Sequence, residues 1–162
     1  MRARDLPMSQ APTPSIAPKP ASTFGGAAWY GLEIRPSSVK GRGLFATRRI
    51  PAGTVVTKVV GEVQNYDYDE ESDYGPTWYA VARGEWIEPF EDSPARFVNH
   101  SCEPNAFMAD TTTIKAARDI RPGEEILIDY ATTEEDPKWL LECRCGTPRC
   151  RRVIRAALSF SS

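Results

Sequence analysis

The chain consists of short apolar and β-branched runs that alternate with turn residues, with almost no long stretch of helical spacing. β-branched and aromatic residues favour strands, and the Gly- and Pro-containing segments between the runs favour turns. The pattern predicts strands at residues 29–34, 54–63, 78–82, 85–88, 111–117 and 125–130. It also predicts a single helical turn at residues 95–99 and a short helix at residues 151–158. Many short strands joined by tight turns indicate a mostly β fold of small curved sheets.

Length and composition indicate one folded domain preceded by a tail. The chain has 162 residues, of which 41% are apolar and 26% charged, as in ordinary soluble domains. Residues 1–26 are rich in Pro, Ala, Ser and Thr without an apolar pattern, so we expect them to be disordered. No membrane span or secretory signal is visible. We therefore expect an intracellular protein, nuclear in a eukaryote and cytoplasmic or host-directed in a bacterium or virus.

The charge distribution bears on the choice of partner. The net charge of -2 gives no support to nucleic-acid binding, which usually needs a basic excess. Acidic residues gather in the middle of the chain, at Asp67, Asp69, Glu70, Glu71, Asp73, Glu85, Glu88, Glu91 and Asp92. They form either a solvated surface or a field that attracts a basic, lysine-rich protein.

The cysteines suggest a metal site. Cys143, Cys145 and Cys150 form a C-x-C-x4-C cluster, and Cys102 lies well upstream. In a reducing compartment such residues are thiols or metal ligands rather than disulfides. Four thiolates form a closed, structural zinc site, whereas the alternative is three surface thiols and one buried thiol. The clustering favours zinc, which would attach the C-terminal tail to the body near Cys102.

Three further motifs are candidate binding segments. Residues 96–105 read Arg-Phe-Val-Asn-His-Ser-Cys-Glu-Pro-Asn and contain the only histidine, His100. A lone histidine is often structural, but so many polar groups beside an apolar pair indicate a ligand site. Tyr130, at the end of residues 123–130, is either a hydrogen-bonding group at a site or an ordinary amphipathic tyrosine. The Gly-x-Gly at residues 41–43 permits close approach of a ligand, although turns use the same residues.

In this order, the blocks resemble the SET domain with its post-SET zinc segment, in the histone-lysine methyltransferase branch. The resemblance covers about residues 29–155. It implies a SET domain at residues 27–135 and a post-SET zinc-binding segment with the tail at residues 136–162. It also implies a knot-like crossing between the segment around Asn99 and the segment ending at Tyr130, an exception to the rule against threaded chains.

The same resemblance implies a protein-lysine N-methyltransferase that uses S-adenosylmethionine and acts on a histone-like or other basic protein. The positions that match cofactor-binding residues are Gly41, Arg42, Gly43, Asn99 and His100. The positions that match tyrosines of the methyl-transfer channel are Tyr130 and, more loosely, Tyr79. The positions that match structural zinc ligands are Cys102, Cys143, Cys145 and Cys150. Ile128 replaces a Tyr or Phe that often influences how many methyl groups are added.

Two other interpretations belong to different classes of protein. A catalytically weak SET-like domain would act as a protein-interaction module, and a methyltransferase assay on basic proteins separates it from an enzyme. A zinc-stapled nucleic-acid binder would contact phosphates through Arg144, Arg149, Arg151, Arg152 and Arg155. The overall acidity and the cofactor-like blocks argue against the second alternative. We therefore expect no direct nucleic-acid binding and no membrane association, and the sequence does not predict an oligomeric state.

Overall fold

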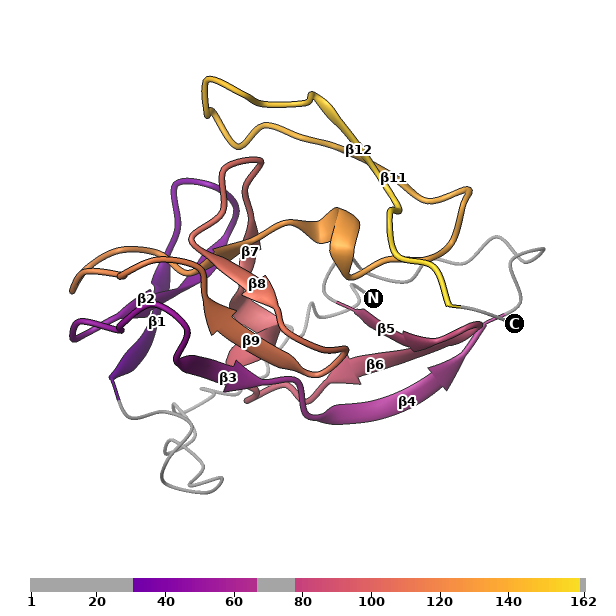
Figure 1. Ribbon diagram of the computed structural model, residues 1–162, viewed down its shortest axis with the longest axis horizontal. Coiled ribbons are helices and arrows are strands. Elements are labelled where there is room, and N and C mark those ends of the chain that lie inside the picture. The colour runs from indigo at the N-terminus through magenta and orange to yellow at the C-terminus, as the bar shows by residue number, and fades with distance from the viewer. Residues whose placement is uncertain (1–30, 67–77, 161–162) are drawn as a thin grey trace, which may run out of the picture.

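The computed structural model describes residues 31–66 and 78–160, which form small β-sheets and short 3-10 helices (Figure 1). The strands are β1 (Leu32–Pro36), β2 (Arg42–Ala46), β3 (Val55–Lys58), β4 (Gly61–Asn65), β5 (Tyr79–Ala82), β6 (Glu85–Pro89), β7 (Asn99–His100), β8 (Ala106–Met108), β9 (Thr113–Ala116), β10 (Leu127–Ile128), β11 (Leu140–Glu142) and β12 (Val153–Arg155). The 3-10 helices are η1 (Pro94–Phe97) and η2 (Tyr130–Thr132). The predicted mostly β fold is confirmed. The predicted tail at residues 1–26 and the acidic residues 67–73 lie outside the described residues.

Antiparallel sheets make up the body of the described part. β1 pairs with β2, β9 lies between β3 and β8, and β6 lies between β4 and β5. The predicted hairpin of β5 and β6 is confirmed, with Gly84 in its turn at φ +73°. The β1–β2 register aligns Pro36 with Arg42, which leaves residues 37–41 as a projecting loop. None of the helices in the described ranges has the length and apolarity needed to cross a bilayer.

The predicted single strand at residues 54–63 is wrong, because the chain changes sheets in its middle. The N–H of buried Val59 donates to the carbonyl of Thr112 at 2.7 Å, on the β9 side. The carbonyl of the next residue, Val60, accepts instead from the N–H of Phe90 at 3.2 Å. β4 then begins at Gly61, where an added Cβ would lie 1.9 Å from the carbonyl oxygen of Glu88. A continuous apolar run therefore covers two strands with different partners.

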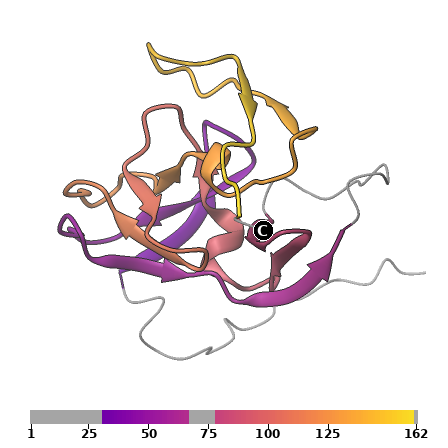
Figure 2. The same ribbon diagram turned by 45° about the vertical axis from the view of Figure 1, so that its right-hand side comes forward.

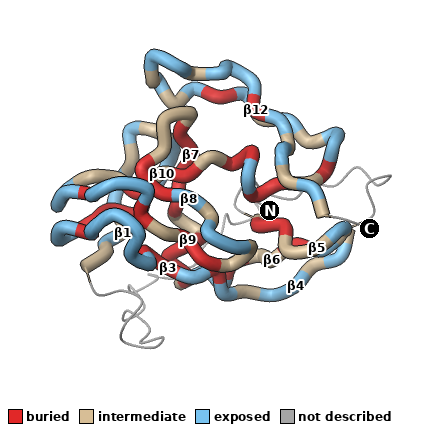
Figure 3. Tube along the Cα trace, viewed as in Figure 1, coloured by how far each residue is buried: buried red, intermediate tan, exposed pale blue. Residues whose placement is uncertain are grey.

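The core gathers side chains from every part of the body. Its largest fully buried members are Trp86, Leu44, Ile114, Ile120, Ile126, Ile128 and Ile154. In Figure 3 the buried positions run along the inner strands and through η2, while the hairpin loops are exposed. A polar side chain, Glu134, is only 3% exposed and accepts a hydrogen bond from Trp86 Nε1 at 2.9 Å. Burial raises the pKa of the Glu134 carboxyl above its ordinary value.

A parallel strand pair brings the two predicted motif segments together. β7 and β10 pair with Asn99 opposite Leu127 and His100 opposite Ile128. The predicted strand at residues 125–130 is therefore shorter than expected. It stops because the Asp129 carboxylate accepts from the N–H of Ala131 at 3.1 Å and caps η2. This pairing puts the two segments of the expected crossing side by side.

The tail folds back as a hairpin instead of the predicted helix at residues 151–158. β11 pairs with β12 in antiparallel fashion, and exposure alternates along β12, with only Ile154 buried. Arg152, just before β12, has a left-handed φ of 66°, which is incompatible with a continuous helix. The N–H groups of Ala157 and Leu158 donate to the carbonyls of Ala131 and Glu134. Figures 1 and 2 show the hairpin at the top, above η2.

Candidate active site and metal centre

A cavity of about 270 Å³ lies where the body meets the tail. Its volume is near the lower end of the range typical of small-molecule sites, roughly 300 Å³. The β1–β2 loop, β7, η2 and the end of β11 all contribute to its wall. The lining residues are Val39, Lys40, Asn99, His100, Tyr130, Leu141, Glu142, Cys143 and Arg144. Four predicted site residues therefore meet here from three separate motifs: Asn99, His100, Tyr130 and the predicted zinc ligand Cys143.

Asn99 uses its side chain to hold the β1–β2 loop. Its Nδ2 donates to the carbonyl oxygens of Lys40 at 3.2 Å and Arg42 at 3.1 Å, and to Glu125 Oε1 at 2.8 Å. The side chain is buried, with 8% of the residue exposed. These hydrogen bonds place Lys40 at the cavity wall. The Asn99 side chain therefore shapes the cavity in two ways, by positioning the loop and by lining the wall itself.

The Gly-x-Gly segment lies behind the cavity wall rather than in it. Gly41 has a left-handed φ of +51° and closes the turn of the loop. The Arg42 guanidinium lies over the Phe97 ring, 4.6 Å from its centroid. At Gly43, an added Cβ would come within 2.1 Å of Glu125 Oε1. The structure thus explains Gly41 by its backbone conformation and Gly43 by its close packing against Glu125, and the cavity is lined by the neighbouring residues Val39 and Lys40.

The two predicted channel tyrosines are buried and donate to backbone carbonyls near η1. The hydroxyl of Tyr130 donates to the carbonyl of Val98 at 2.9 Å, and that of Tyr79 donates to the carbonyl of Ala95 at 2.8 Å. Burial raises the pKa of both phenols above the ordinary value near 10. Neither hydroxyl is therefore suited to act as a base near neutral pH. Tyr130 reaches the cavity wall, whereas Tyr79 is not among the lining residues.

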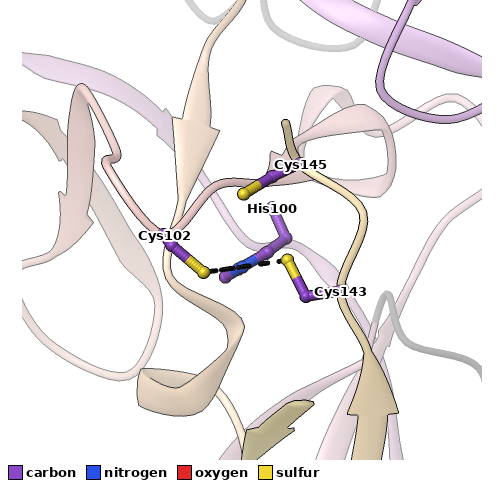
Figure 4. A group of neighbouring side chains, drawn as sticks. All are labelled: His100, Cys102, Cys143 and Cys145. Atoms are coloured by element: carbon purple, nitrogen blue, oxygen red, sulfur yellow. Dashed lines mark hydrogen bonds between the residues drawn. The ribbon is translucent and has the colours of Figure 1, made fainter. Parts of the chain in front are cut away.

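The predicted zinc ligands lie close together where the tail hairpin meets the segment around Cys102. Cys102 Sγ lies 3.7 Å from Cys143 Sγ, which lies 3.6 Å from Cys150 Sγ. The ligand atoms of His100, Cys102, Cys143 and Cys145 all lie within 4.8 Å of one another, and Figure 4 shows their side chains converging. Zinc binds sulfur at about 2.3 Å, so two sulfurs of a tetrahedral set lie about 3.8 Å apart. The two sulfur separations match that distance, while the group whose ligand atoms lie within 4.8 Å of one another contains His100 and not Cys150.

His100 also approaches the cluster, but its hydrogen bonds give it another role than that of a ligand. Its Nδ1 accepts from the N–H of Tyr130 at 3.1 Å, and its Nε2 lies 3.4 Å from Cys102 Sγ. Burial lowers the pKa of His100 to about 4, so the ring is neutral. A neutral ring that accepts at Nδ1 carries its proton on Nε2 and donates that proton toward the Cys102 sulfur. These hydrogen bonds favour Cys150 over His100 as the fourth candidate ligand.

The tail is fastened to η2 by an arginine beside the cysteines. The N–H of Arg151 donates to Cys102 Sγ at 3.3 Å, and its guanidinium pairs with the Asp129 carboxylate at 2.5 Å. Asp129 also caps η2, which begins at Tyr130. The cysteine cluster, the cap and the channel tyrosine are therefore one connected unit.

Sequence reasoning missed three polar residues that hold this site together. Glu125 accepts from Asn99, and Glu134 accepts from Trp86. Asn105 donates to the carbonyl of Glu125 at 2.7 Å and accepts from the N–H of Leu127 at 2.9 Å, which fixes the approach to β10. Asn105 lies within the motif at residues 96–105, which was a usable signal, whereas nothing local distinguishes Glu125 from its neighbour Glu124.

Comparison with known families identifies the class of protein. The model of the SET domain matches residues 41–131, which is more than half of the chain. The match begins at Gly41 in the β1–β2 loop and ends in η2, so it includes Asn99, His100 and Tyr130 of the cavity wall but not Val39 and Lys40. The chain therefore belongs to the SET domain family, as predicted.

The similar proteins are large histone-lysine methyltransferases. Histone-lysine N-methyltransferase 2B of Homo sapiens is 33% identical over 133 residues, which cover 73% of this chain and 5% of that protein. Histone-lysine N-methyltransferase set1 of Dictyostelium discoideum is 32% identical over 139 residues, covering 76% of this chain and 9% of that protein. The chain thus spans under a tenth of the length of these relatives.

A solved structure resembles the fold. The crystal structure of KRYPTONITE in complex with mCHH DNA, an H3(1-15) peptide and SAH has a TM-score of 0.58 and 27% identity. The alignment covers 76% of this chain and 29% of that chain. The DNA, the peptide and the SAH are ligands of that protein.

Proposed function

We propose that this protein is an S-adenosylmethionine-dependent protein-lysine N-methyltransferase that acts on a histone or another basic protein. The observation that carries the proposal is the parallel pairing of β7 with β10, which brings Asn99, His100 and Tyr130 to one cavity within a SET domain. The SAH in the similar solved structure supports a cofactor of this kind. The histone methyltransferases among the relatives support the substrate class.

The cavity fits the amino-acid end and the base of such a cofactor. Asn99 and His100 present backbone groups from a two-residue strand, and their side chains are already committed to the loop and to the cysteine cluster. Gly41, Arg42 and Gly43 act through the loop that carries Lys40. When bound, the cofactor supplies a methyl group on a positively charged sulfur.

The buried tyrosines would prepare the lysine rather than deprotonate it. A lysine amine has an ordinary pKa of about 10.4 and attacks only when neutral. A narrow, largely apolar channel at Tyr130 and Tyr79 disfavours the ammonium form, as would the nearby sulfonium. The tyrosines would orient the nitrogen, and alignment would contribute most of the rate. Ile128 is fully buried in the core, so its influence on the number of methyl groups would be exerted through packing.

A structural zinc ion held by Cys102, Cys143, Cys145 and Cys150 completes the proposal. The sulfur separations of 3.6 and 3.7 Å support it, as does the Nε2–H of His100, which would hydrogen-bond a thiolate. Such an ion would order residues 136–162 as a separate post-SET segment against the SET domain at residues 27–135. A histone-type substrate would place the protein inside the cell, with chromatin in a eukaryote.

The decisive experiment is mass spectrometry of core histones and a cell lysate after incubation with the protein and S-adenosylmethionine. We expect new methyl-lysine on a basic protein, and the same spectra give its site and degree. A protein that binds the cofactor but methylates nothing would instead support the interaction-module alternative.

Cofactor binding is tested separately by calorimetry. Asn99→Ala should weaken S-adenosylmethionine binding about tenfold or more, because it removes the bonds to Lys40, Arg42 and Glu125 that hold the loop, at a cost of about 1–3 kcal/mol. Asn65→Ala, at the exposed end of β4, is the matched control and should bind like the wild type. Equal affinity for wild type and Asn99→Ala would remove Asn99 from the cofactor site.

A further inference from the structure

Glu125 joins three segments that are distant in the sequence. Its Oε2 accepts from the Ser37 hydroxyl at 2.9 Å, and its Oε1 accepts from Asn99 Nδ2 at 2.8 Å. Its backbone forms an isolated bridge with Phe45 of β2. Glu125 therefore contacts the start of the β1–β2 loop and strand β7 through its carboxylate, and strand β2 through its backbone.

The loop held by this carboxylate carries part of the cavity wall. Ser37 Oγ accepts from the N–H of Val39 at 2.9 Å, and Asn99 Nδ2 donates to the carbonyl of Lys40 at 3.2 Å. Val39 and Lys40 both line the cavity. Val39 is thus hydrogen-bonded to the Ser37 side chain and Lys40 to the Asn99 side chain, and both of these side chains are hydrogen-bonded to Glu125.

Gly43 supplies an independent sign that the carboxylate position is required. Gly43 does not have a left-handed φ, so backbone conformation does not call for glycine there. A Cβ at this position would lie 2.1 Å from Glu125 Oε1, far inside van der Waals contact. The glycine leaves room for a carboxylate, which a side chain at this position would displace.

We infer that Glu125 is a positioning residue for cofactor binding: its carboxylate clamps Ser37 and Asn99 and so fixes the loop at residues 37–42 against the cavity. Glu125 does not line the cavity itself and acts through Val39, Lys40 and Asn99. The inference rests on the proposed function, since it assigns Glu125 to the binding of S-adenosylmethionine. Charged acceptors form stronger hydrogen bonds than neutral ones, which suits a carboxylate to this clamp.

The first test measures binding of S-adenosylmethionine to the full chain by calorimetry and steady-state kinetics. Glu125→Ala should raise the Kd about tenfold, equivalent to about 1.4 kcal/mol, and should raise KM for the cofactor more than it lowers kcat at saturation. Glu125→Gln keeps an acceptor for Asn99 and a donor for Ser37, and should recover most of the affinity. Glu124→Ala is the control and should bind within about twofold of the wild type, because its carboxylate faces Arg118 on the surface.

The second test needs no cofactor. Gly43→Ala should lower the melting temperature by about 4 °C or more in the wild-type background, as overpacking does. In the Glu125→Ala background the same change should have a clearly smaller effect, because the clashing oxygen is gone. The remaining neighbour, Ser37 Cβ at 3.1 Å from the added Cβ, allows only partial rescue.

The outcomes separate the two claims. The positioning role would be overturned if Glu125→Ala bound S-adenosylmethionine with wild-type affinity. It would also be overturned if Gly43→Ala lowered the melting temperature equally in the wild-type and Glu125→Ala backgrounds. If the wild type itself binds no S-adenosylmethionine, the proposed function fails and the positioning role fails with it. The melting temperatures of the two single variants and the double variant would still show whether Glu125 and Gly43 are coupled. Coupled melting with the expected loss and rescue of affinity supports both.

Discussion

Replacing Tyr130 by Phe removes one hydroxyl, and the structure gives that hydroxyl two separate consequences. The first concerns stability, because the group donates to the Val98 carbonyl at 2.9 Å and the residue is only 6% exposed. A lost hydrogen bond of this kind costs about 1 kcal/mol, or up to about 3 if the carbonyl stays unpaired. For a chain of this size, each kcal/mol lowers the melting temperature by about 2–4 °C. We therefore expect a drop of about 2–12 °C.

The second consequence is catalytic, and Tyr79→Phe isolates it. Tyr79 loses a nearly identical bond, 2.8 Å to the Ala95 carbonyl, and is equally buried, so its melting shift should be similar. Only Tyr130 lines the cavity. At a temperature well below both melting points, Tyr130→Phe should lower kcat about a hundredfold with little change in KM, since misplaced alignment has about this effect. Tyr79→Phe should lower it less. Equal losses of kcat in the two variants, or wild-type turnover in Tyr130→Phe, would refute this assignment.

Four further predictions concern the metal site, Glu134 and Gly61. Removing the metal with a strong chelator should weaken S-adenosylmethionine binding, because residues 141–144 line the cavity and their order depends on the metal. Added zinc should restore the affinity. Elemental analysis would confirm that the metal is gone, and an unchanged affinity of the metal-free protein in calorimetry would contradict this prediction. Glu134→Ala should lower the free energy of unfolding by about 1–3 kcal/mol by leaving Trp86 Nε1 unpaired, as chemical denaturation would show. Because the pKa of Glu134 is higher in the folded state than in the unfolded state, the stability that its protonated form contributes is lost as pH rises above about 4.5. Glu134→Gln has no such loss and should become more stable relative to the wild type over that range. A difference in unfolding free energy between the two proteins that does not change with pH would be evidence against this. Gly61→Ala should destabilise the protein by about 1–3 kcal/mol, because its Cβ would strike the Glu88 carbonyl; an unchanged melting temperature would show that β6 yields easily.

Local patterns predicted the elements that depend on local chemistry. The β5–β6 hairpin was predicted because Gly84 marks its turn, and the helical turn predicted at residues 95–99 corresponds to η1, which begins at Pro94. Patterns failed where tertiary partners decide the outcome. Val59 and Val60 look alike in sequence, yet one bonds toward β9 and the other toward Phe90. Residues 151–158 show how a left-handed Arg152 and pairing with β11 override an apparent helix.

The candidate site shows the same division. The sequence motifs pointed to Asn99, His100 and Tyr130, and the fold brings them to one cavity. The partners of these residues could not be predicted, because they come from distant segments. The sequence does not distinguish Glu125 from Glu124, and only the fold shows that the Glu125 carboxylate accepts a hydrogen bond from Ser37. The approach of His100 to Cys102 likewise depends on the bond from Tyr130, which exists only after β7 and β10 pair.

The division of the cavity wall between body and tail has a consequence for biosynthesis. The wall residues Val39, Asn99 and Tyr130 leave the ribosome well before Leu141 to Arg144, and the cysteine cluster is complete only with Cys150. Translation proceeds at about 5–20 residues per second, so a nascent chain passes through a stage in which the body can fold while its cavity is still open on one side. A chain truncated before Leu141 would therefore lack the tail side of the cavity wall, and one truncated before Cys150 would keep that side but lack one cysteine of the cluster.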